Sequence, residues 1–138
     1  MSKTKSPNGT FEIVELQHDD DSYMYSNTRH DWRVVSVVTG DQFAQFSGSS
    51  EANASGSSES GTVSVSFSDS GDAVIATDAD GTTERVLLPA SVRTVEGGKQ
   101  IETVGHDGTI VREKRRPAIM WTKYGQVICH PLVDDPGK

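Results

Sequence analysis

The sequence predicts an all-β protein, a single antiparallel β-barrel or two-sheet sandwich formed as a meander of about eight to ten short strands. Residues 62–68 alternate, with Val63, Val65 and Phe67 on one face and four hydroxyl side chains on the other. The composition, rich in Ser and Gly with 33% hydrophobic residues, fits a thin sandwich or small barrel with many turns. Turn dipeptides also recur between extended runs, and Asp-Gly and Gly-Gly favour hairpins because type I′ turns need positive φ. They are Ser70-Gly71, Asp80-Gly81, Gly97-Gly98, Asp107-Gly108 and Tyr124-Gly125.

The first thirty residues contain one predicted strand. Residues 1–9 are polar and lack an apolar stretch, so we expect a flexible N-terminal tail. Residues 10–17 place an apolar side chain on each face, which indicates an edge strand. The acidic run 18–22 predicts a turn, and the short aromatic run 23–25 precedes a predicted loop over 26–30.

The most apolar segment is 31–39, with Trp32, Val34 and Val38 on one parity and Val35 and Val37 on the other. Apolar residues on both faces are typical of a central strand covered on both sides. Gly40 and Asp41 form the next predicted turn. Residues 42–46 fit a returning strand, but the three-residue spacing of Phe43 and Phe46 equally fits a short helical turn.

Residues 47–61 consist of Ser, Gly, Glu, Ala and Asn, without one large apolar side chain. Burial therefore cannot offset the entropy of ordering this segment, and we expect a mobile Ser/Gly-rich loop. The absence of aromatic and basic residues argues against a binding role for that loop.

The remaining chain completes one β domain over 10–133, followed by a short C-terminal tail over 134–138. After the strand at 62–68, the turn signals delimit seven further predicted strands. These are 72–77, 82–88, 90–95, 99–104, 109–114, 118–123 and 126–129.

Charge and cysteine content narrow the functional classes. The net charge is −7, and residues 1–107 hold 17 acids against 7 bases, whereas 108–138 hold 3 acids against 6 bases. An acidic domain repels nucleic acid and anionic membranes and favours basic partners. The single cysteine, Cys129, excludes an intramolecular disulfide and fits a reducing compartment. No run reaches the roughly 20 apolar residues of a membrane span, so we expect a cytoplasmic protein.

Neither a metal site nor a catalytic site is indicated, and we expect no cofactor. The Asp-rich run 78–84 lacks the ligand spacing of a calcium loop, because Ala76 stands where a ligand is needed. Turns favour Asp for local backbone bonding, which accounts for Asp69, Asp72 and the acidic run 18–21 equally well. Cys129 and His130 are adjacent, so on a strand they point to opposite faces and His130 is badly placed to activate the thiol.

The strongest surface signal is the basic run 112–116, which is followed by aromatic and basic residues that we expect on the next strand of the same hairpin. Such a ribbon could contact phosphates and stack on bases. Alternatively, it is a charged edge that discourages aggregation, or it meets the acidic face of another copy in a head-to-tail assembly. The candidate binding residues are Arg112, Lys114, Arg115, Arg116, Trp121, Lys123 and Tyr124.

Together these features predict a non-enzymatic β protein that acts through protein–protein contacts or self-assembly, as a structural or accessory subunit of a larger, viral or cellular assembly. One alternative is a module that binds single-stranded nucleic acid weakly through the 112–124 ribbon. Another is an acidic inhibitor or immunity-type protein that binds a basic partner.

Overall fold

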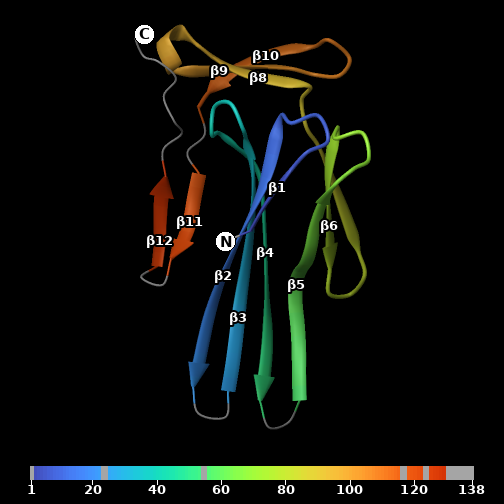
Figure 1. The fold of residues 1–138 in the computed structure, drawn as a ribbon, viewed down its shortest axis with the longest axis vertical. Coiled ribbons are helices and arrows are strands. Elements are labelled where there is room, and N and C mark those ends of the chain that lie inside the picture. The colour runs from blue at the N-terminus through green and yellow to red at the C-terminus, as the bar shows by residue number, and fades with distance from the viewer. Residues whose placement is uncertain (1, 23–24, 54–55, 116–117, 123–124, 130–138) are drawn as a thin grey trace.

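The computed structural model describes residues 2–22, 25–53, 56–115, 118–122 and 125–129, and within them the chain is all-β, as predicted (Figure 1). Seven antiparallel strands follow one another as a curled meander, a three-stranded sheet lies across one end, and two strands form a separate hairpin. The strands are β1 (Ser2–Lys5), β2 (Phe11–Ser22), β3 (Tyr25–Ser36), β4 (Gln42–Asn53), β5 (Gly56–Phe67), β6 (Ala73–Asp78), β7 (Thr83–Leu87), β8 (Ser91–Val95), β9 (Gln100–Val104), β10 (Ile110–Lys114), β11 (Ala118–Thr122) and β12 (Gly125–Cys129), with a 3₁₀ turn, η1 (Glu96–Gly98), before β9.

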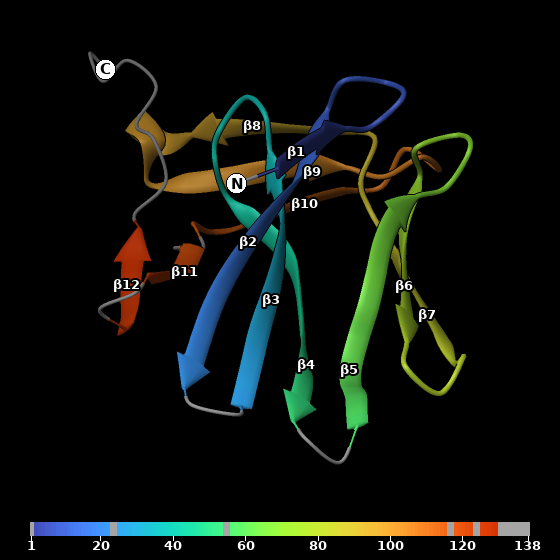
Figure 2. The ribbon, with the colours of Figure 1, turned by 60° about the horizontal axis from the view of Figure 1, so that its bottom comes forward.

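The curl of the seven-stranded sheet depends on β5, which pairs with β4 along its first half and with β6 along its second. The change occurs where Gly48 faces Gly61. A Cβ on Gly48 would overlap the Thr62 carbonyl oxygen, and one on Gly61 would lie 2.7 Å from the Ser47 carbonyl oxygen. Gly61 also has φ +73°, a conformation that glycine adopts without strain. Two glycines therefore let β5 leave β4 and cross to the other side of the core (Figure 2).

A β-bulge resolves the ambiguity over 42–46 in favour of a strand. Val34 pairs with Ala44 but Val35 pairs with Gln42, so Phe43 is an extra residue in β4. A bulge shifts the side-chain alternation by one position, which turns both Phe43 and Phe46 toward the core. The ring of Phe43 contacts that of Phe11 edge-on, at a centroid distance of 5.2 Å.

Two turns with a shared hydrogen-bond pattern hold the curled sheet at its covered end. In the β1–β2 turn the Ser6 hydroxyl accepts from the Phe11 N–H at 3.1 Å, and in the β5–β6 turn Ser68 accepts from Ala73 at 3.2 Å. Both serines are buried. A Cβ on Gly71 would lie 3.3 Å from side-chain atoms of Pro7 and Asn8, so these turns touch although their strands lie far apart in the sheet.

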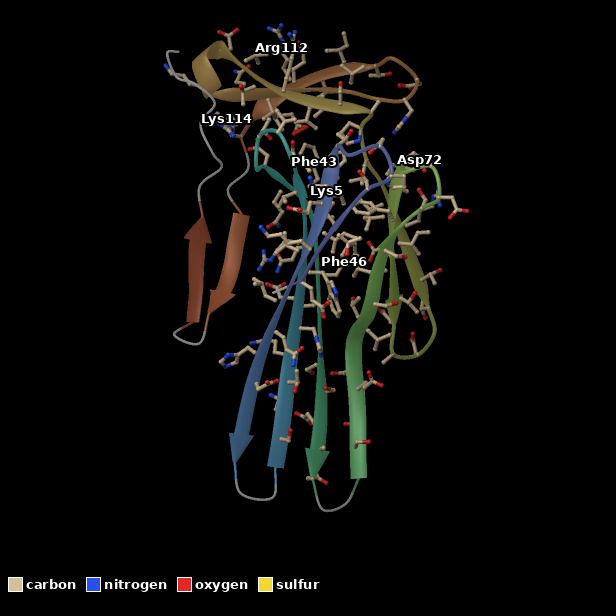
Figure 3. All side chains as sticks on the ribbon, viewed as in Figure 1. Lys5, Phe43, Phe46, Asp72, Arg112 and Lys114 are labelled. Carbon is tan, nitrogen blue, oxygen red and sulfur yellow. The ribbon has the colours of Figure 1, made fainter. Side chains whose placement is uncertain are left out.

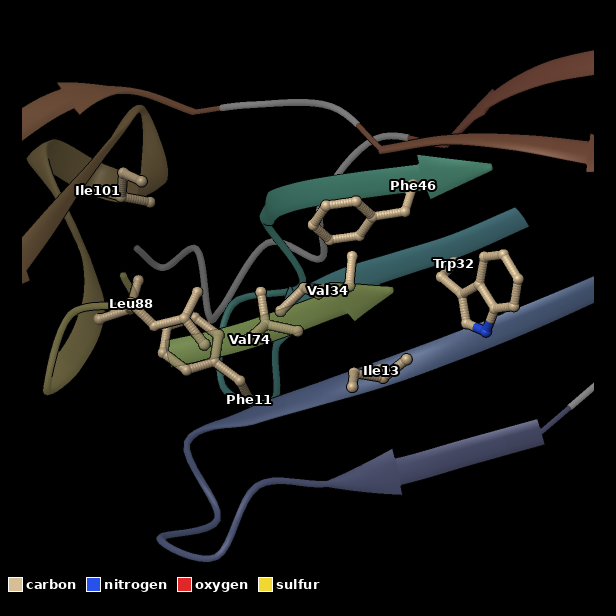
Figure 4. Close-up of a cluster of buried hydrophobic side chains, with 10 residues drawn as sticks. Phe11, Ile13, Trp32, Val34, Phe46, Val74, Leu88 and Ile101 are labelled. Carbon is tan, nitrogen blue, oxygen red and sulfur yellow. The ribbon is translucent and has the colours of Figure 1, made fainter. Parts of the chain in front are cut away.

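The core lies inside the curl and under the three-stranded sheet (Figure 4). Because side chains alternate along a strand, inward-facing residues from both sides of the curl meet there. Leu88, Val92 of β8 and Ile101 of β9 cover the end of the cluster that lies under the three-stranded sheet. The buried members are Phe11, Ile13, Trp32, Val34, Phe46, Val74, Ala76, Leu88, Val92 and Ile101.

The prediction of a central strand over 31–39 is confirmed in its main point, because β3 lies between β2 and β4 and is buried on both faces from Asp31 to Val34. The strand ends at Ser36, and Val37 and Val38 are exposed in the following turn. The seven strands predicted after residue 71 are all present, each within about two residues of the expected bounds.

Three expectations for the amino-terminal half are wrong. Residues 2–5 form β1 and pair with β2 rather than forming a tail, so the strand predicted over 10–17 is not an edge strand along that part. The predicted turn over 18–22 and loop over 26–30 are the paired ends of β2 and β3. The segment 47–61, expected as a loop, forms the paired parts of β4 and β5 on either side of residues 54–55. Backbone pairing, which needs no apolar side chain, accounts for all three.

Throughout the part of the chain that is described, no helix has the length and apolar character needed to cross a membrane.

Candidate interaction surfaces

The predicted basic and aromatic ribbon does not form. β10 pairs with β9, and β11 pairs with β12, so the runs containing Arg112 and Trp121 are not strands of one hairpin. For Trp121 the structure describes only its place in β11. Arg116, Lys123 and Tyr124 lie outside the described residues. The sequence-predicted site is therefore reduced to Arg112, Lys114 and Arg115.

Arg112 projects from the outer face of the three-stranded sheet (Figure 3), and Lys114, two residues farther along β10, is also exposed. In the register of β8, β9 and β10, Arg93, Glu102 and Arg112 lie side by side. Glu102 accepts from the Nε atoms of Arg93 at 2.7 Å and Arg112 at 2.9 Å, and these bonds, with Arg93 first, lower the pKa of the Glu102 carboxyl. Glu102 is itself buried, whereas the two arginines are more than half exposed. We call Arg93, Arg112 and Lys114 the basic face.

Arg93 was not predicted as a site residue, although the sequence contains a signal for it. Once 90–95 and 99–104 are paired through the Gly97-Gly98 turn, Arg93 falls opposite Glu102. A base directly across from an acid on one face of a sheet is a recognisable cross-strand pair.

Arg115, which the sequence analysis grouped with the surface bases, instead reaches into the structure. Its side chain is 10% exposed and forms an ion pair at 3.3 Å with Asp41, which is fully buried. Its guanidinium also donates to the carbonyl oxygens of Thr39 at 2.7 Å and Gly98 at 3.3 Å. Arg115 therefore joins the end of β10 to the β3–β4 turn and to η1, which is a structural role.

A second feature lies at the opposite end of the molecule, where four strands continue past the core as a ribbon of polar residues (Figure 1). We call residues 17–22, 25–30, 47–53 and 56–61 the polar arm. In the sequence it carries five carboxylates and one arginine, and Tyr25 is its only large apolar side chain. Of its described side chains, not one is buried. Because this region lacks an apolar face, most of it was predicted as turn and loop.

Side-chain hydrogen bonds cover the inner face of the polar arm, the face continuous with the core. The His30 ring stacks on Trp32 at a centroid distance of 5.5 Å and contacts the Glu15 carboxylate at 3.2 Å. Thr28 donates to Asp19 at 2.9 Å, and hydrogen bonds from Gln17 and Thr28 lower the pKa of Asp19. Farther out is an open hollow of about 250 Å³, lined by Ser26, Thr28, Ser50, Glu51, Ala52, Ser57, Ser58 and Glu59.

The opposite face of β3 carries a buried ion pair near the root of the arm. Asp31 Oδ2 accepts from Arg33 Nε at 2.9 Å and from Nη2 at 2.6 Å, and both side chains are at most 2% exposed. Burial raises the pKa of the Asp31 carboxyl, and the Arg33 guanidinium offsets only part of that effect. Arg33 also donates to the Gln42 side chain at 3.1 Å, which links this β3 pair to β4.

The acidic runs examined for metal binding have local roles. Asp80 accepts from the Thr82 N–H at 2.9 Å and Asp107 from the Thr109 N–H at 3.0 Å, as expected for turn residues. Asp72 accepts from the Ser68 hydroxyl at 2.8 Å. Within the described ranges no three His, Cys, Asp or Glu side chains converge as metal ligands. The Cys129 side chain and His130 lie outside what is described.

One larger hollow, of about 440 Å³, lies between the β7–β8 connection and the β9–β10 turn. Its lining combines Leu87, Leu88 and Pro89 with His106 and acidic side chains. It holds no Ser, Thr, Cys or Lys that could act as a nucleophile beside His106.

The chain matches no protein-family model, no curated protein sequence and no solved structure. Its own geometry defines it as a small antiparallel β protein with a polar arm at one end and a basic face at the other.

Proposed function

We propose that this protein is a non-enzymatic interaction module, a structural or accessory subunit of a larger assembly, and that the polar arm is the element that meets its protein partner. The observation that carries the proposal is that the arm extends beyond the core without burying an apolar face of its own. Ordering a residue costs roughly 1–2 kcal/mol of backbone entropy. Strands that bury no apolar surface add little stability to the fold, so their presence is better explained by a surface that binds a partner.

The charge of the arm favours a basic partner. Its five carboxylates outnumber its one arginine, and complementary charge mainly increases association rate and specificity. The basic face of another copy is one such surface, which would give a head-to-tail assembly. An unrelated basic protein, bound as an inhibitor or immunity protein binds its target, fits the same electrostatics. With a single cysteine in the chain, we place this function in a reducing compartment, the cytoplasm.

The test is an armless variant that keeps the register of the strands. Residues 19–28 and 50–59 are each replaced by Asn-Gly, which joins His18 to Arg29 and Ser49 to Ser60. These pairs already face each other, and by the alternation along each strand they are the ones whose backbone groups point toward each other, as a two-residue turn requires. We expect cooperative unfolding to persist. Partners that co-purify with the tagged full chain from its own cells should be lost with the armless variant and retained with a Lys5→Glu variant, which reverses an exposed charge outside the arm and the basic face. Recovery of the same partners with the armless variant would refute the proposal.

A second candidate function, weak binding of single-stranded nucleic acid, is favoured by the exposed guanidinium groups of Arg93 and Arg112 beside Lys114. Phosphate contacts of this kind weaken steeply with salt. We expect any binding of an oligonucleotide at low salt to fall at physiological salt and to be lost in an Arg112→Ala, Lys114→Ala double variant. No binding at low salt would exclude this function.

A further inference from the structure

One edge of the polar arm has no strand beside it among the described residues. β6 pairs with β5 only from Thr62 onward, so the segment Gly56–Ser60 has β4 on one side and solvent on the other (Figures 1 and 2). The last bond along this edge is the one from the Ala79 N–H to the Gly61 carbonyl oxygen, at 2.9 Å. Backbone groups alternate in direction along a strand. Ser57 and Glu59 therefore point their N–H and C=O groups outward, as Gly61 does.

This edge lacks the features that normally prevent strand pairing between molecules. Such edges usually carry lysine, proline, a bulge or several charges. Gly56–Ser60 carries one charge, Glu59, and the β5 bulge lies beyond it, between Thr62 and Ser64. The other long edge of the arm, in β2, carries Asp19, Asp20 and Asp21. Only the β5 edge is close to neutral, so the two edges of the arm differ in their capacity to accept another strand.

From this difference we infer that two copies of the chain associate through their β5 edges, as an antiparallel, two-fold symmetric pair that joins the two polar arms into one eight-stranded sheet. The inference rests on the proposed function, since it makes a second copy one partner of the arm. This contact uses the nearly neutral β5 edge and is separate from the basic partner that the arm's carboxylates favour. A second copy fits because the edge is self-compatible in charge, whereas the acidic β2 edge repels its own copy. Pairing of two identical patches is the isologous interface of a dimer.

The charges and the bonded groups favour one register, the one that pairs all five residues of Gly56–Ser60 with those of the second copy. When Ser58 lies opposite Ser58 of the second copy, Ser57 and Glu59 face each other reciprocally, and their outward groups form the ladder. A shift that placed Glu59 opposite its own copy would set like charges face to face. It would also require the Gly61 carbonyl oxygen, which Ala79 already occupies. A ladder this short gives a weak and transient dimer.

Disulfide trapping tests this register. Residues that do not exchange ladder bonds lie about 4.5 Å apart at Cα, within disulfide range, and Ser58 is such a residue in the proposed pair. In a Cys129→Ser background we expect Ser58→Cys to form a covalent dimer under mild oxidation at least about tenfold faster than Ser60→Cys, which faces Gly56 of the other copy. Adding Ser57→Pro should abolish this trapping, because it removes an outward N–H while leaving the bonds to β4.

Equal trapping at positions 58 and 60, or trapping that persists with Ser57→Pro, would show random collision and overturn the inference. No covalent dimer at millimolar protein would also overturn it, while the co-purification test of the armless variant would still stand for a different partner. Far-ultraviolet circular dichroism and urea unfolding of every variant establish that a lost dimer is not a lost fold.

Discussion

Replacing Arg115 with methionine is expected to destabilise the fold by about 3–5 kcal/mol, the cost of removing one member of a buried ion pair. Asp41 is fully buried, and Arg115 contacts it together with the carbonyl oxygens of Thr39 and Gly98. Methionine keeps most of the side-chain length and removes the charge and every donor. The loss is large because the Asp41 carboxylate remains in the interior without this cation.

Urea unfolding measures this loss, and two further variants identify its source. Lys114→Met, at the exposed last residue of β10, should change the free energy of unfolding by less than about 0.5 kcal/mol. The double variant Asp41→Asn, Arg115→Met should be more stable than the sum of the single losses predicts, with a coupling of roughly 0.5–3 kcal/mol. If Arg115→Met costs no more than Lys114→Met, Arg115 is a surface base and the structural role given to it is wrong.

Three further predictions concern the core, the point where β5 leaves β4, and the Asp-Gly turns. Trp32→Ala should cost about 3–5 kcal/mol and the half-buried Phe67→Ala clearly less, and equal losses in urea would contradict the packing. Gly48→Ala should destabilise the fold by about 3 kcal/mol or more, because overpacking against movable side chains already costs about 1–3 kcal/mol and the obstacle here is the Thr62 backbone. Ser49→Ala is the control. Equal stability of the two variants would refute the steric role given to Gly48 where β5 leaves β4. Hydrogen bonds from Thr82 and Thr109 lower the pKa of Asp80 and Asp107. The stabilisation from these two carboxylates is therefore present above the unfolded pKa of about 4 and is lost as pH falls through the folded value. The free energies of unfolding of the native chain and of the Asp80→Asn, Asp107→Asn variant should converge at low pH, and a difference that does not change with pH would contradict this.

The strands after residue 71 were predictable because local turn chemistry determines them. Asp107-Gly108 forms the β9–β10 turn, where the Gly105 N–H donates to the Thr109 carbonyl oxygen at 2.8 Å and Gly108 donates back to Gly105. The matching bonds at Asp80-Gly81 join Asp78 to Thr82. Such turns bring together strands that are neighbours in sequence. They do not specify the other neighbour of each strand, which is why β10 was wrongly paired with β11.

The candidate site was partly predictable for a related reason. Alternation along β10 places Arg112 and Lys114 on one face and Arg115 on the other, and this parity is readable from the sequence. The burial of Arg115 depends on Asp41, a residue 74 positions away in the chain. Long-range ion pairs of this kind have no local signal, so a basic run at a strand end was interpreted as surface.

The polar arm escaped prediction because hydrophobic alternation was the signal used for strands, and the arm has none. Its order comes from backbone pairing to its neighbours, with Gly48 facing Gly61 and Asn53 facing Gly56. Without apolar burial, each added strand gains little beyond its ladder bonds, about 1 kcal/mol each. Along Gly56–Ser60, β5 has only one ladder, so a second ladder from another chain would stabilise it. The lack of apolar burial that prevented prediction of the arm is therefore also the reason why a partner strand would stabilise its nearly neutral β5 edge.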